Sequence, residues 1–584
     1  MSTIWSKSCF RGICCGALVV FTAALAAADD VLKLVPDNAL GVVVINRVGE
    51  TNDKIRALAL RLKVPPFDVL GTAKLTLGVQ KGLDDKGSVA LAAIPSTPNG
   101  VPVMVAFVAA SDPVALAEQL NAEIGDDGVA KLSLADRPVV AAAKDGYAVI
   151  TEEANKPTLL AVIAGAKSIA EAVPALTDWR SDNDVYAVTT PAGVKFAQQQ
   201  IEFGLQVAKT QMANQGEQGE AALAGLAMYD ALVAAMDKEI SHAAIGLRMA
   251  DDGAVHLVSR TVPVEGGVLA SAATSAKPLK TSSLAGLPQT PYFIAGGGVF
   301  TPASMKPWLE ISFGMMKSYP GWDKLNDQQI KKLSKISLQS MQGMRSMAML
   351  LGVAQGNEPL YGRMLMVMKT KDAKAYLDNY EAAMGEMAEI LKDTGQPLLA
   401  FESQRMEVDG LPVLKLAMNM KPFLGPGQGP ETEKMMELMF GGGDMMSTYF
   451  AAADQTTVVG AYVSPDQLVT AVQAIREGKP PLADEAGVAQ TLAMLPPGAQ
   501  WVGLVSPRGG AAFVARMMKS LKIVGAPGPG PEAIPELPET PPIGLGVLLS
   551  PSGLDTDLAI PAAVLEAVSE AVRKAMAERG QPEA

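Results

Sequence analysis

The chain has 584 residues, of which 49% are hydrophobic and 19% are charged, and its formal net charge at pH 7 is −12. This composition is sufficient for large apolar cores and excludes a disordered chain. The acidic balance argues against nucleic acid as a partner, because binding to a phosphate backbone depends on clustered Lys and Arg side chains.

Residues 1–28 are predicted to form a Sec-type signal peptide. Lys7 and Arg11 precede an apolar run at 13–28, which ends in small residues that suit a cleavage site. We therefore expect an exported protein, located in the periplasm, at the cell surface or outside the cell; a retained anchor is the alternative. Cys9, Cys14 and Cys15 are the three cysteines of the chain, and all lie in this segment. The mature chain would then have no disulfide bond, and we expect it to have no membrane span.

The remainder repeats one pattern, with a first unit at 29–263 and a second at 286–584. Matched pieces occur in the same order in both units. They are Leu34-Val35-Pro36 with Gly286-Leu287-Pro288, Met104–Val108 with Met364–Met368, Leu132–Val140 with Met406–Leu414, Ala141–Val149 with Ala451–Val459, Thr190-Pro191 with Ser506-Pro507, and Ile245-Gly246-Leu247 with Ile543-Gly544-Leu545. Conserved order along one chain predicts a tandem duplication.

Within each unit, short β-type runs joined by turns alternate with amphipathic segments. Lys144-Asp145-Gly146 and Asp251-Asp252-Gly253 are typical of β-hairpin turns. Strands joined by hairpins, with helices between groups of strands, predict the α+β class. We expect a tandem duplication of a unit whose mainly antiparallel sheet is covered by helices.

The two units are predicted to differ in their insertions. The first should contain a helical hairpin at about 196–240, with Ile201, Leu205, Ala208 and Met212 on one apolar stripe and Leu226, Tyr229, Val233 and Met236 on the other. The second should contain a long helical segment at 308–344, an insertion at about 419–447, a proline-rich strap at 527–542 and a C-terminal helix at about 562–578. Residues 264–285, rich in Ala, Ser and Gly, are interpreted as the linker between the units.

Polar residues that could carry chemistry are few and scattered. His242 and His256 both fall in the last predicted hairpin of the first unit, and they are interpreted as ordinary strand residues because no acidic co-ligands can be placed beside them. Ser181-Asp182-Asn183 matches one motif of serine β-lactamases, but the other motifs of that family are missing, so it is interpreted as a turn. Asp178, Asp182 and Asp184 lack the glycine and distal glutamate of a calcium-binding loop.

Methionine is the most unusual feature, since 20 of the 30 methionines fall between Met305 and Met446. Met364, Met366 and Met368 alternate along one predicted strand, so they should share one face, which we interpret as part of the core. A second cluster comprises Met435, Met436, Met439, Met445 and Met446. These thioethers could bind Cu(I), but core packing or an adaptable apolar surface is favoured because no histidine lies nearby.

Each unit begins with a short leader, Leu34-Val35-Pro36 or Gly286-Leu287-Pro288, before its first strand. A helix capped by Asp112 or Asp372 and a turn-strand pair follow. This order resembles a group of exported bacterial proteins of unknown function that are built from repeated α+β units. The resemblance supports the predicted location and architecture and implies no catalytic residue or cofactor. Our leading interpretation is an exported, non-catalytic protein that acts through binding or structure, with an unknown protein or an apolar ligand as partner. A carrier of an apolar ligand or lipid, a Met-rich Cu(I)-handling protein and a carboxylate-dependent hydrolase are the alternatives.

Overall fold

A computed structural model describes residues 31–578 except 96–99, 135–136, 166, most of 214–237, most of 277–285, most of 300–324, 393–400, 420–429, 443–444 and 524–533. The predicted signal peptide lies outside these described residues. The chain divides into two units. Unit 1 comprises the residues up to Ile201 together with Asp237–Val264, and unit 2 comprises Glu202–Met236 and everything from Glu265 onward. The predicted first unit included 202–236, which group instead with unit 2.

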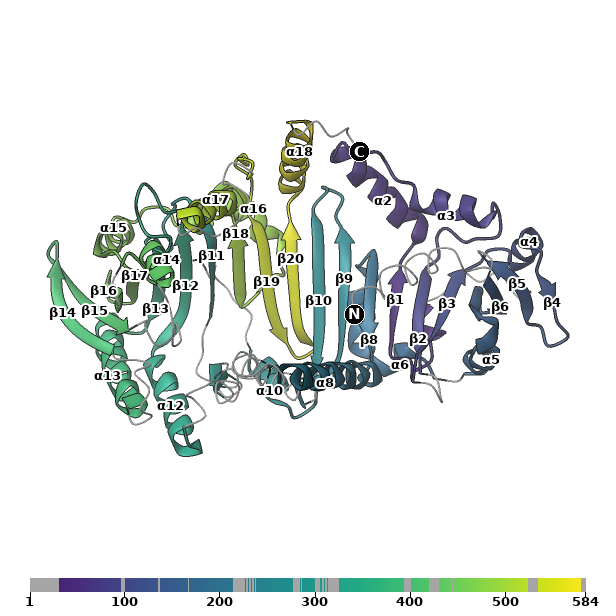
Figure 1. The fold of residues 1–584 in the computed structure, drawn as a ribbon, viewed down its shortest axis with the longest axis horizontal. Coiled ribbons are helices and arrows are strands. Elements are labelled where there is room, and N and C mark those ends of the chain that lie inside the picture. Colours follow the sequence, from purple (N-terminus) through teal and green to yellow (C-terminus); the bar gives the residue numbers. More distant parts are fainter. Residues whose placement is uncertain are drawn as a thin grey trace. The chain divides into compact units, whose positions relative to one another are not determined.

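Unit 1 is built on an antiparallel sheet. Among its described strands the hydrogen-bonded order is β10-β9-β8-β1-β2-β3-β7-β6-β5-β4, and every neighbouring pair is antiparallel (Figure 1). The strands are β1 (Gly41–Ile45), β2 (Val89–Ile94), β3 (Val103–Ala109), β4 (Glu123–Ile124), β5 (Ala130–Leu134), β6 (Arg137–Lys144), β7 (Tyr147–Glu152), β8 (Val185–Thr189), β9 (Ile240–Met249) and β10 (Val255–Pro263). The helices are α2 (Val48–Arg61), α3 (Val69–Leu77), α4 (Pro113–Gln119), α5 (Lys156–Ala164), α6 (Ile169–Ala172) and α7 (Thr177–Ser181), with three short 3-10 turns, η1 (Val31–Lys33), η2 (Glu153–Asn155) and η3 (Pro174–Leu176).

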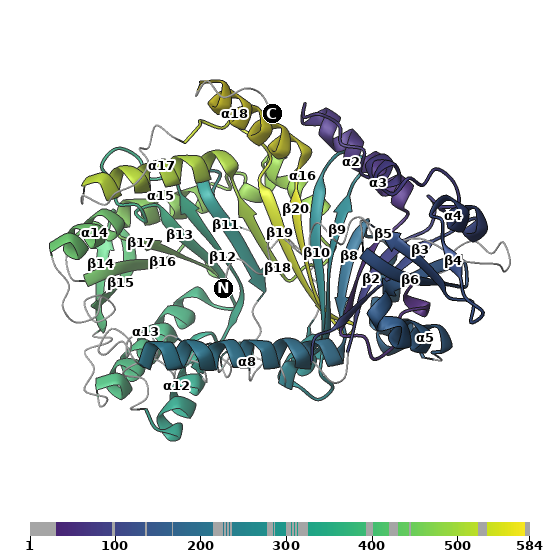
Figure 2. The same cartoon turned by 45° about the vertical axis from the view of Figure 1, so that its right-hand side comes forward.

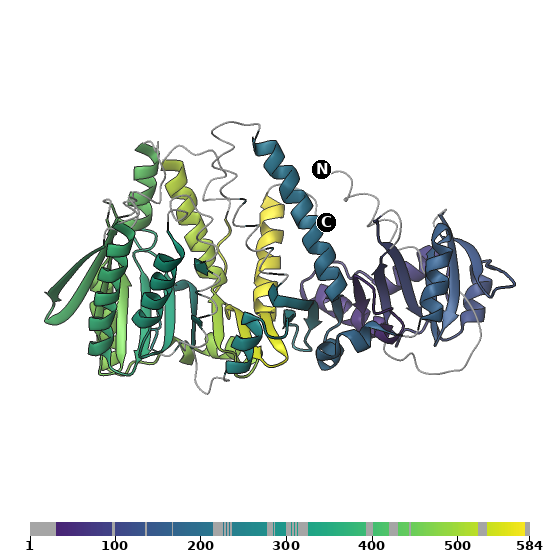
Figure 3. The same ribbon diagram turned by 90° about the horizontal axis from the view of Figure 1, so that it is seen from below.

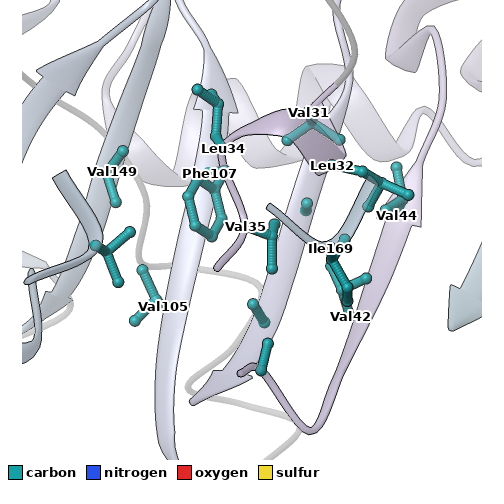
Figure 4. Packing of buried hydrophobic residues seen from close by; sticks show 14 of the residues in the cluster. Val31, Leu32, Leu34, Val35, Val42, Val44, Val105, Phe107, Val149 and Ile169 are labelled. Atoms are coloured by element: carbon teal, nitrogen blue, oxygen red, sulfur yellow. The ribbon is translucent and has the colours of Figure 1, made fainter. Parts of the chain in front are cut away.

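The main core of unit 1 lies between one face of this sheet and the segment that precedes β1. Leu32 and Val35 from that segment are fully buried against Val44 of β1, Phe107 of β3 and other apolar side chains (Figure 4). Helices α5 and α6 complete the cover, because Leu159 and Ile169 belong to the same cluster. The apolar leader at Leu34-Val35-Pro36 is therefore part of the core and covers one face of the sheet.

Unit 2 repeats the arrangement strand for strand. Its described order is β20-β19-β18-β11-β12-β13-β17-β16-β15-β14, again antiparallel throughout. The strands are β11 (Tyr292–Val299), β12 (Met344–Gly352), β13 (Met364–Thr370), β14 (Phe401–Val408), β15 (Leu411–Asn419), β16 (Met445–Ala452), β17 (Thr457–Tyr462), β18 (Trp501–Val505), β19 (Ile543–Ser550) and β20 (Gly553–Ile560). The helices are α10 (Val268–Ser275), α12 (Asp327–Ser340), α13 (Ala373–Lys392), α14 (Pro430–Phe440), α15 (Pro465–Arg476), α16 (Ala486–Met494), α17 (Pro507–Ile523) and α18 (Ala562–Glu578), with the 3-10 turn η5 (Leu482–Asp484).

The two leaders are held by equivalent backbone hydrogen bonds. In unit 1 the N–H of Ile169 donates to the carbonyl of Val35 at 2.8 Å, and in unit 2 the N–H of Leu482 donates to the carbonyl of Leu287 at 2.7 Å. The prolines that follow these leader residues, Pro36 and Pro288, each form an isolated bridge to the same connecting segments. Equal strand order and equal leader bonds are what a tandem duplication would produce; the duplication itself stays a prediction.

One piece of the predicted alignment is wrong. Pro138 was matched with Pro412, yet Pro138 lies on β6, which pairs directly with β7, whereas Pro412 lies on β15, which is separated from β17 by β16. By sheet position β6 corresponds to β16. The two hairpins were confused because both are short runs of alternating apolar residues, and the two-residue strand β4, the counterpart of β14, gives no sequence signal.

The predicted insertions fall at connections between strands. In unit 1, β5 ends at Leu134 and β6 begins at Arg137. In unit 2 the equivalent strands, β15 and β16, are separated by the segment predicted as an insertion at about 419–447, which contains α14. The C-terminal helix is α18 with the predicted bounds, and the described part of the strap, 534–542, has no helix or strand. Most of the predicted hairpin's first helix lies in α8 (Pro191–Ala213), which Figure 3 shows as one continuous dark blue helix. The predicted linker contains α10, and within 308–344 the described helix is α12.

The helices that follow β8 and β18 begin with the same close contact. The Thr190 and Ser506 hydroxyl groups each accept a hydrogen bond at 3.1 Å from the N–H three residues on, at Gly193 and Gly509. A Cβ atom added at Gly193 would overlap the carbonyl oxygen of Leu40, and one at Gly509 would overlap that of Tyr292. Glycine is therefore required at both positions for the helix to approach the start of the central strand.

We expect Gly193→Ala to lower the free energy of unfolding by about 2–3 kcal/mol, because the new methyl group must displace backbone. Gly204→Ala is the matched control in the same helix, where an added Cβ meets nothing within 4 Å, and it should leave stability unchanged or raise it by about 0.5 kcal/mol. Urea unfolding followed by circular dichroism measures both. Equal effects of the two substitutions would contradict the proposed contact.

Candidate binding surface

The two histidines do not form a site. His242 is paired across the strands with Val262 and His256 with Arg248, so they are six residue positions apart along the β9–β10 hairpin, a distance of roughly 20 Å. Burial lowers the pKa of His242, and the His256 Nδ1 atom lies 3.2 Å from the Arg248 Nη2 atom. Both are strand residues, as predicted.

Asp184 is the most buried carboxylate among the described residues, and all its contacts are structural. One carboxylate oxygen accepts a hydrogen bond from the N–H of Met249 at 2.7 Å, and the other lies 2.8 Å from the ammonium group of Lys54. Burial alone would lower the pKa of Lys54, but hydrogen bonds and charges from Asp184 and Glu50 outweigh it and raise this pKa. Asp184 thus joins β8 to β9 and α2.

Unit 2 makes the same connection with a neutral side chain. Gln500 precedes β18 as Asp184 precedes β8, and its side-chain oxygen accepts the N–H of Leu549 at 2.7 Å while its side-chain nitrogen donates to the Leu549 carbonyl at 3.0 Å. A neutral amide makes the equivalent hydrogen bonds in unit 2. We therefore interpret Asp184 as a residue that anchors β8 to β9.

Of the other predicted acidic candidates, Asp178 lies on α7, and its side chain is outside the described residues. Ser181 ends α7, and Asp182 and Asn183 form the turn before β8, as predicted. The Asn183 side chain is buried and donates to the carbonyl of Trp179 at 2.7 Å. Within the described part of the chain no group of three or more His, Cys, Asp or Glu side chains could hold a metal ion.

The second methionine cluster is spread over two elements. Met435, Met436 and Met439 lie on α14, and Met445 and Met446 lie on β16. Met436, Met439 and Met446 are half-buried, and Met446 pairs across the sheet with Met418; the side chains of Met435 and Met445 are outside the described residues. Copper binding by these thioethers stays an untested alternative.

The first sheet has a second face that is also apolar. Cross-strand partners share a face, so the registers place one set of side chains together opposite the leader. The apolar side chains of this open face of unit 1 are Ile45, Val43, Val89, Leu91, Ala93, Met104, Val185, Ala187, Ala243, Ile245, Leu247 and Leu257, and Thr189, Ser259 and Thr261 share the face. Val43 is 48% exposed and Ile245 49% exposed, and the face carries no charged side chain. Larger exposed apolar patches of this kind mark interaction sites.

The corresponding face of unit 2 is lined by methionine, glycine and aliphatic residues. This open face of unit 2 consists of Ile294, Gly296, Gly298, Met347, Met349, Leu351, Met364, Met366, Trp501, Gly503, Val505, Ile543, Leu545 and Val547. Met349 is 39% exposed and Leu545 40% exposed. Met364, Met366 and Met368 share this face, as predicted, but only Met368 is fully buried, where the hydroxyl group of Tyr376 on α13 lies 3.3 Å from its sulfur.

Both open faces are distinct from the best-formed pockets of the described structure. Three pockets of about 720, 590 and 300 Å³ are lined by other residues, with charged groups such as Arg363, Lys54 and Arg47 among them. The sequence interpretation missed the open faces, although a signal was present. β1 reads GVVVI and β8 reads VYAVT, without the alternating polar residues of a strand that has one face in water.

Comparison with known proteins identifies no relative. No protein-family model matches the chain, and neither a curated protein nor a solved structure matches it significantly. Among the described residues no helix is both long and apolar enough to cross a membrane.

We expect Asp184→Ala to destabilise unit 1 by about 2–3 kcal/mol, because it leaves the buried N–H of Met249 without its acceptor and removes the shorter of the two ion pairs of Lys54, whose other partner is Glu50 at 3.3 Å. Hydrogen exchange of β8 and β9 peptides measures the effect within the unit. The double substitution Lys54→Met/Asp184→Gln, which introduces the glutamine found at the equivalent position of unit 2 and removes the cation, should recover most of the protection. If Asp184→Ala exchanges at the wild-type rate, the anchoring role is wrong.

Proposed function

We propose that this is an exported protein that acts by binding an apolar protein surface, without catalysing a reaction. The observation that carries the proposal is that each unit's sheet is mainly apolar on both faces. One face packs against the leader, and the other has exposed apolar side chains, such as Val43 and Ile245 in unit 1 and Met349 and Leu545 in unit 2. Burying such an exposed apolar face against a partner is favourable, because the free energy gained is proportional to the apolar area removed from water.

The chemistry of the open faces indicates the class of partner. The open face of unit 1 has no charged side chain, so it offers no ion pair and favours a partner surface that is equally uncharged. In unit 2 the exposed Met349 and the half-buried Met364 supply flexible, polarisable contacts that can adapt to different apolar shapes. These faces lie outside the three pockets, which favours an extended protein surface over a small apolar molecule.

The function can be tested with the fluorescent apolar probe bis-ANS and the double variant Val43→Lys/Ile245→Lys. The wild-type chain should enhance the fluorescence of bis-ANS, and the variant should reduce this enhancement by roughly half, because two central side chains of one of the two faces become charged. Far-UV circular dichroism should be unchanged, since both side chains are about half exposed. Val568→Lys/Val572→Lys on α18, at similar exposure, is the control and should have a smaller effect.

Light scattering completes the test, because a second copy of the chain is itself an apolar protein surface. Dimerisation that is lost in Val43→Lys/Ile245→Lys would identify that partner. Fluorescence and oligomeric state that both match the wild type would show that the open face of unit 1 is not a binding surface.

A further inference from the structure

A second exposed apolar region lies in unit 1, away from the open face. It is the segment from Arg56 to Lys81, here called the arm, which contains the end of α2, a loop with Pro65-Pro66 and helix α3. Figure 2 shows α2 and α3, in purple, beyond the ends of the unit 1 strands. Five large apolar side chains of the arm are exposed: Leu60, Val64, Phe67, Val69 and Leu75. Leu75, at 83%, is the most exposed large apolar side chain among the described residues.

The arm is ordered by specific contacts. The side-chain oxygen of Asn52 on α2 accepts the N–H of Leu70, and its side-chain nitrogen donates to Asp68, both at 3.1 Å. Asp68 in turn accepts the N–H of Gly71 at 2.7 Å and caps α3. Two adjacent prolines restrict the loop before Phe67. The exposed apolar side chains are therefore presented from a fixed backbone, and ordering them on a partner costs little conformational entropy.

The charge of the arm is opposite to that of the chain. It carries five cations, Arg56, Arg61, Lys63, Lys74 and Lys81, and one carboxylate, Asp68, so its net charge is +4 in a chain of −12. Hydrogen bonds from Gly71 and Asn52 lower the pKa of Asp68, which keeps it committed to capping. Lys74 is also paired with Asp85 at 2.7 Å and Arg56 with Asp53 at 3.8 Å, and the guanidinium group of Arg61 donates to the carbonyl of Asp252. Lys63 and Lys81 flank the apolar side chains in sequence.

We propose that the arm binds the surface of an anionic phospholipid bilayer, with Phe67 and Leu75 inserted among the acyl chains and the lysines at the headgroups. Exposed apolar side chains on an ordered projection, flanked by Lys and Arg, are the features of interfacial membrane binding. Phe67 and Leu75 project from a loop and a helix and line none of the three pockets. They are therefore better placed to insert into a lipid layer than to form a pocket for a side chain of a protein partner. This inference is independent of the open sheet faces.

Co-sedimentation of the full chain with vesicles tests the proposal, using phosphatidylcholine alone and phosphatidylcholine with phosphatidylglycerol. The apolar stretch at 13–28 is present in every variant, so differences between variants report the arm. Phe67→Asp/Leu75→Asp should weaken binding to the anionic vesicles by roughly tenfold or more, since each substitution removes an inserted apolar side chain and adds a like charge. Lys63→Glu/Lys81→Glu should weaken binding to the anionic vesicles and have little effect on the neutral ones.

Phe203→Asp, at an exposed position on α8 outside the arm, is the matched control and should bind as the wild type does. Circular dichroism confirms that the variants fold. The proposal is overturned if the two arm variants sediment with vesicles as the wild type does, or if Phe203→Asp loses as much binding as Phe67→Asp/Leu75→Asp. It is also overturned if arm-dependent binding is the same for neutral and anionic vesicles, because the cations would then have no part in it.

Discussion

In each unit the strand that follows the leader is hydrogen-bonded to a neighbour on both sides. The leader, the helix after β8 or β18 and the buried polar anchor are all positioned relative to this central strand. β1 lies between β2 and β8, and β11 lies between β12 and β18. The apolar leader runs directly into this strand, the helix after β8 or β18 packs against its first residues through a glycine, and a buried polar side chain anchors the strand next to it. Each unit is thus organised from its centre outward.

In a sheet so organised, one face is largely buried, and burial of the second face depends on the outer elements that cover it. In unit 1, Leu116 of α4 covers the β3–β7 end, and in unit 2, Tyr376 of α13 covers the β13–β17 end. On the same side, Val43, Ile245 and Met349 on more central strands are exposed, so the described elements cover this part less. The proposed binding function follows from this uneven cover, and the methionines of unit 2 fill the boundary between the buried and the open part.

Sequence reasoning predicted the α+β class and the antiparallel sheets because turns, caps and leaders are local signals. It misassigned the 132–140 hairpin, since strand pairing depends on long-range contacts that alternating apolar residues do not specify. It also treated apolar strands as core without asking which face was covered, so Val43 and Ile245 were not recognised as exposed. Asp184 was considered for calcium, and only coordinates could show that Lys54, 130 positions away, neutralises it.

Unit 1 has the Asp184–Lys54 ion pair where unit 2 has the neutral side chain of Gln500. The stability of the two units should therefore depend differently on high pH. The pKa of Lys54 is raised in the folded chain, so its stabilising contribution is complete below the unfolded value near 10.5 and is lost as the pH rises through the higher folded value. The amide of Gln500 does not titrate. In strong base, unit 1 would therefore loosen at this anchor through deprotonation, whereas the neutral anchor of unit 2 would hold.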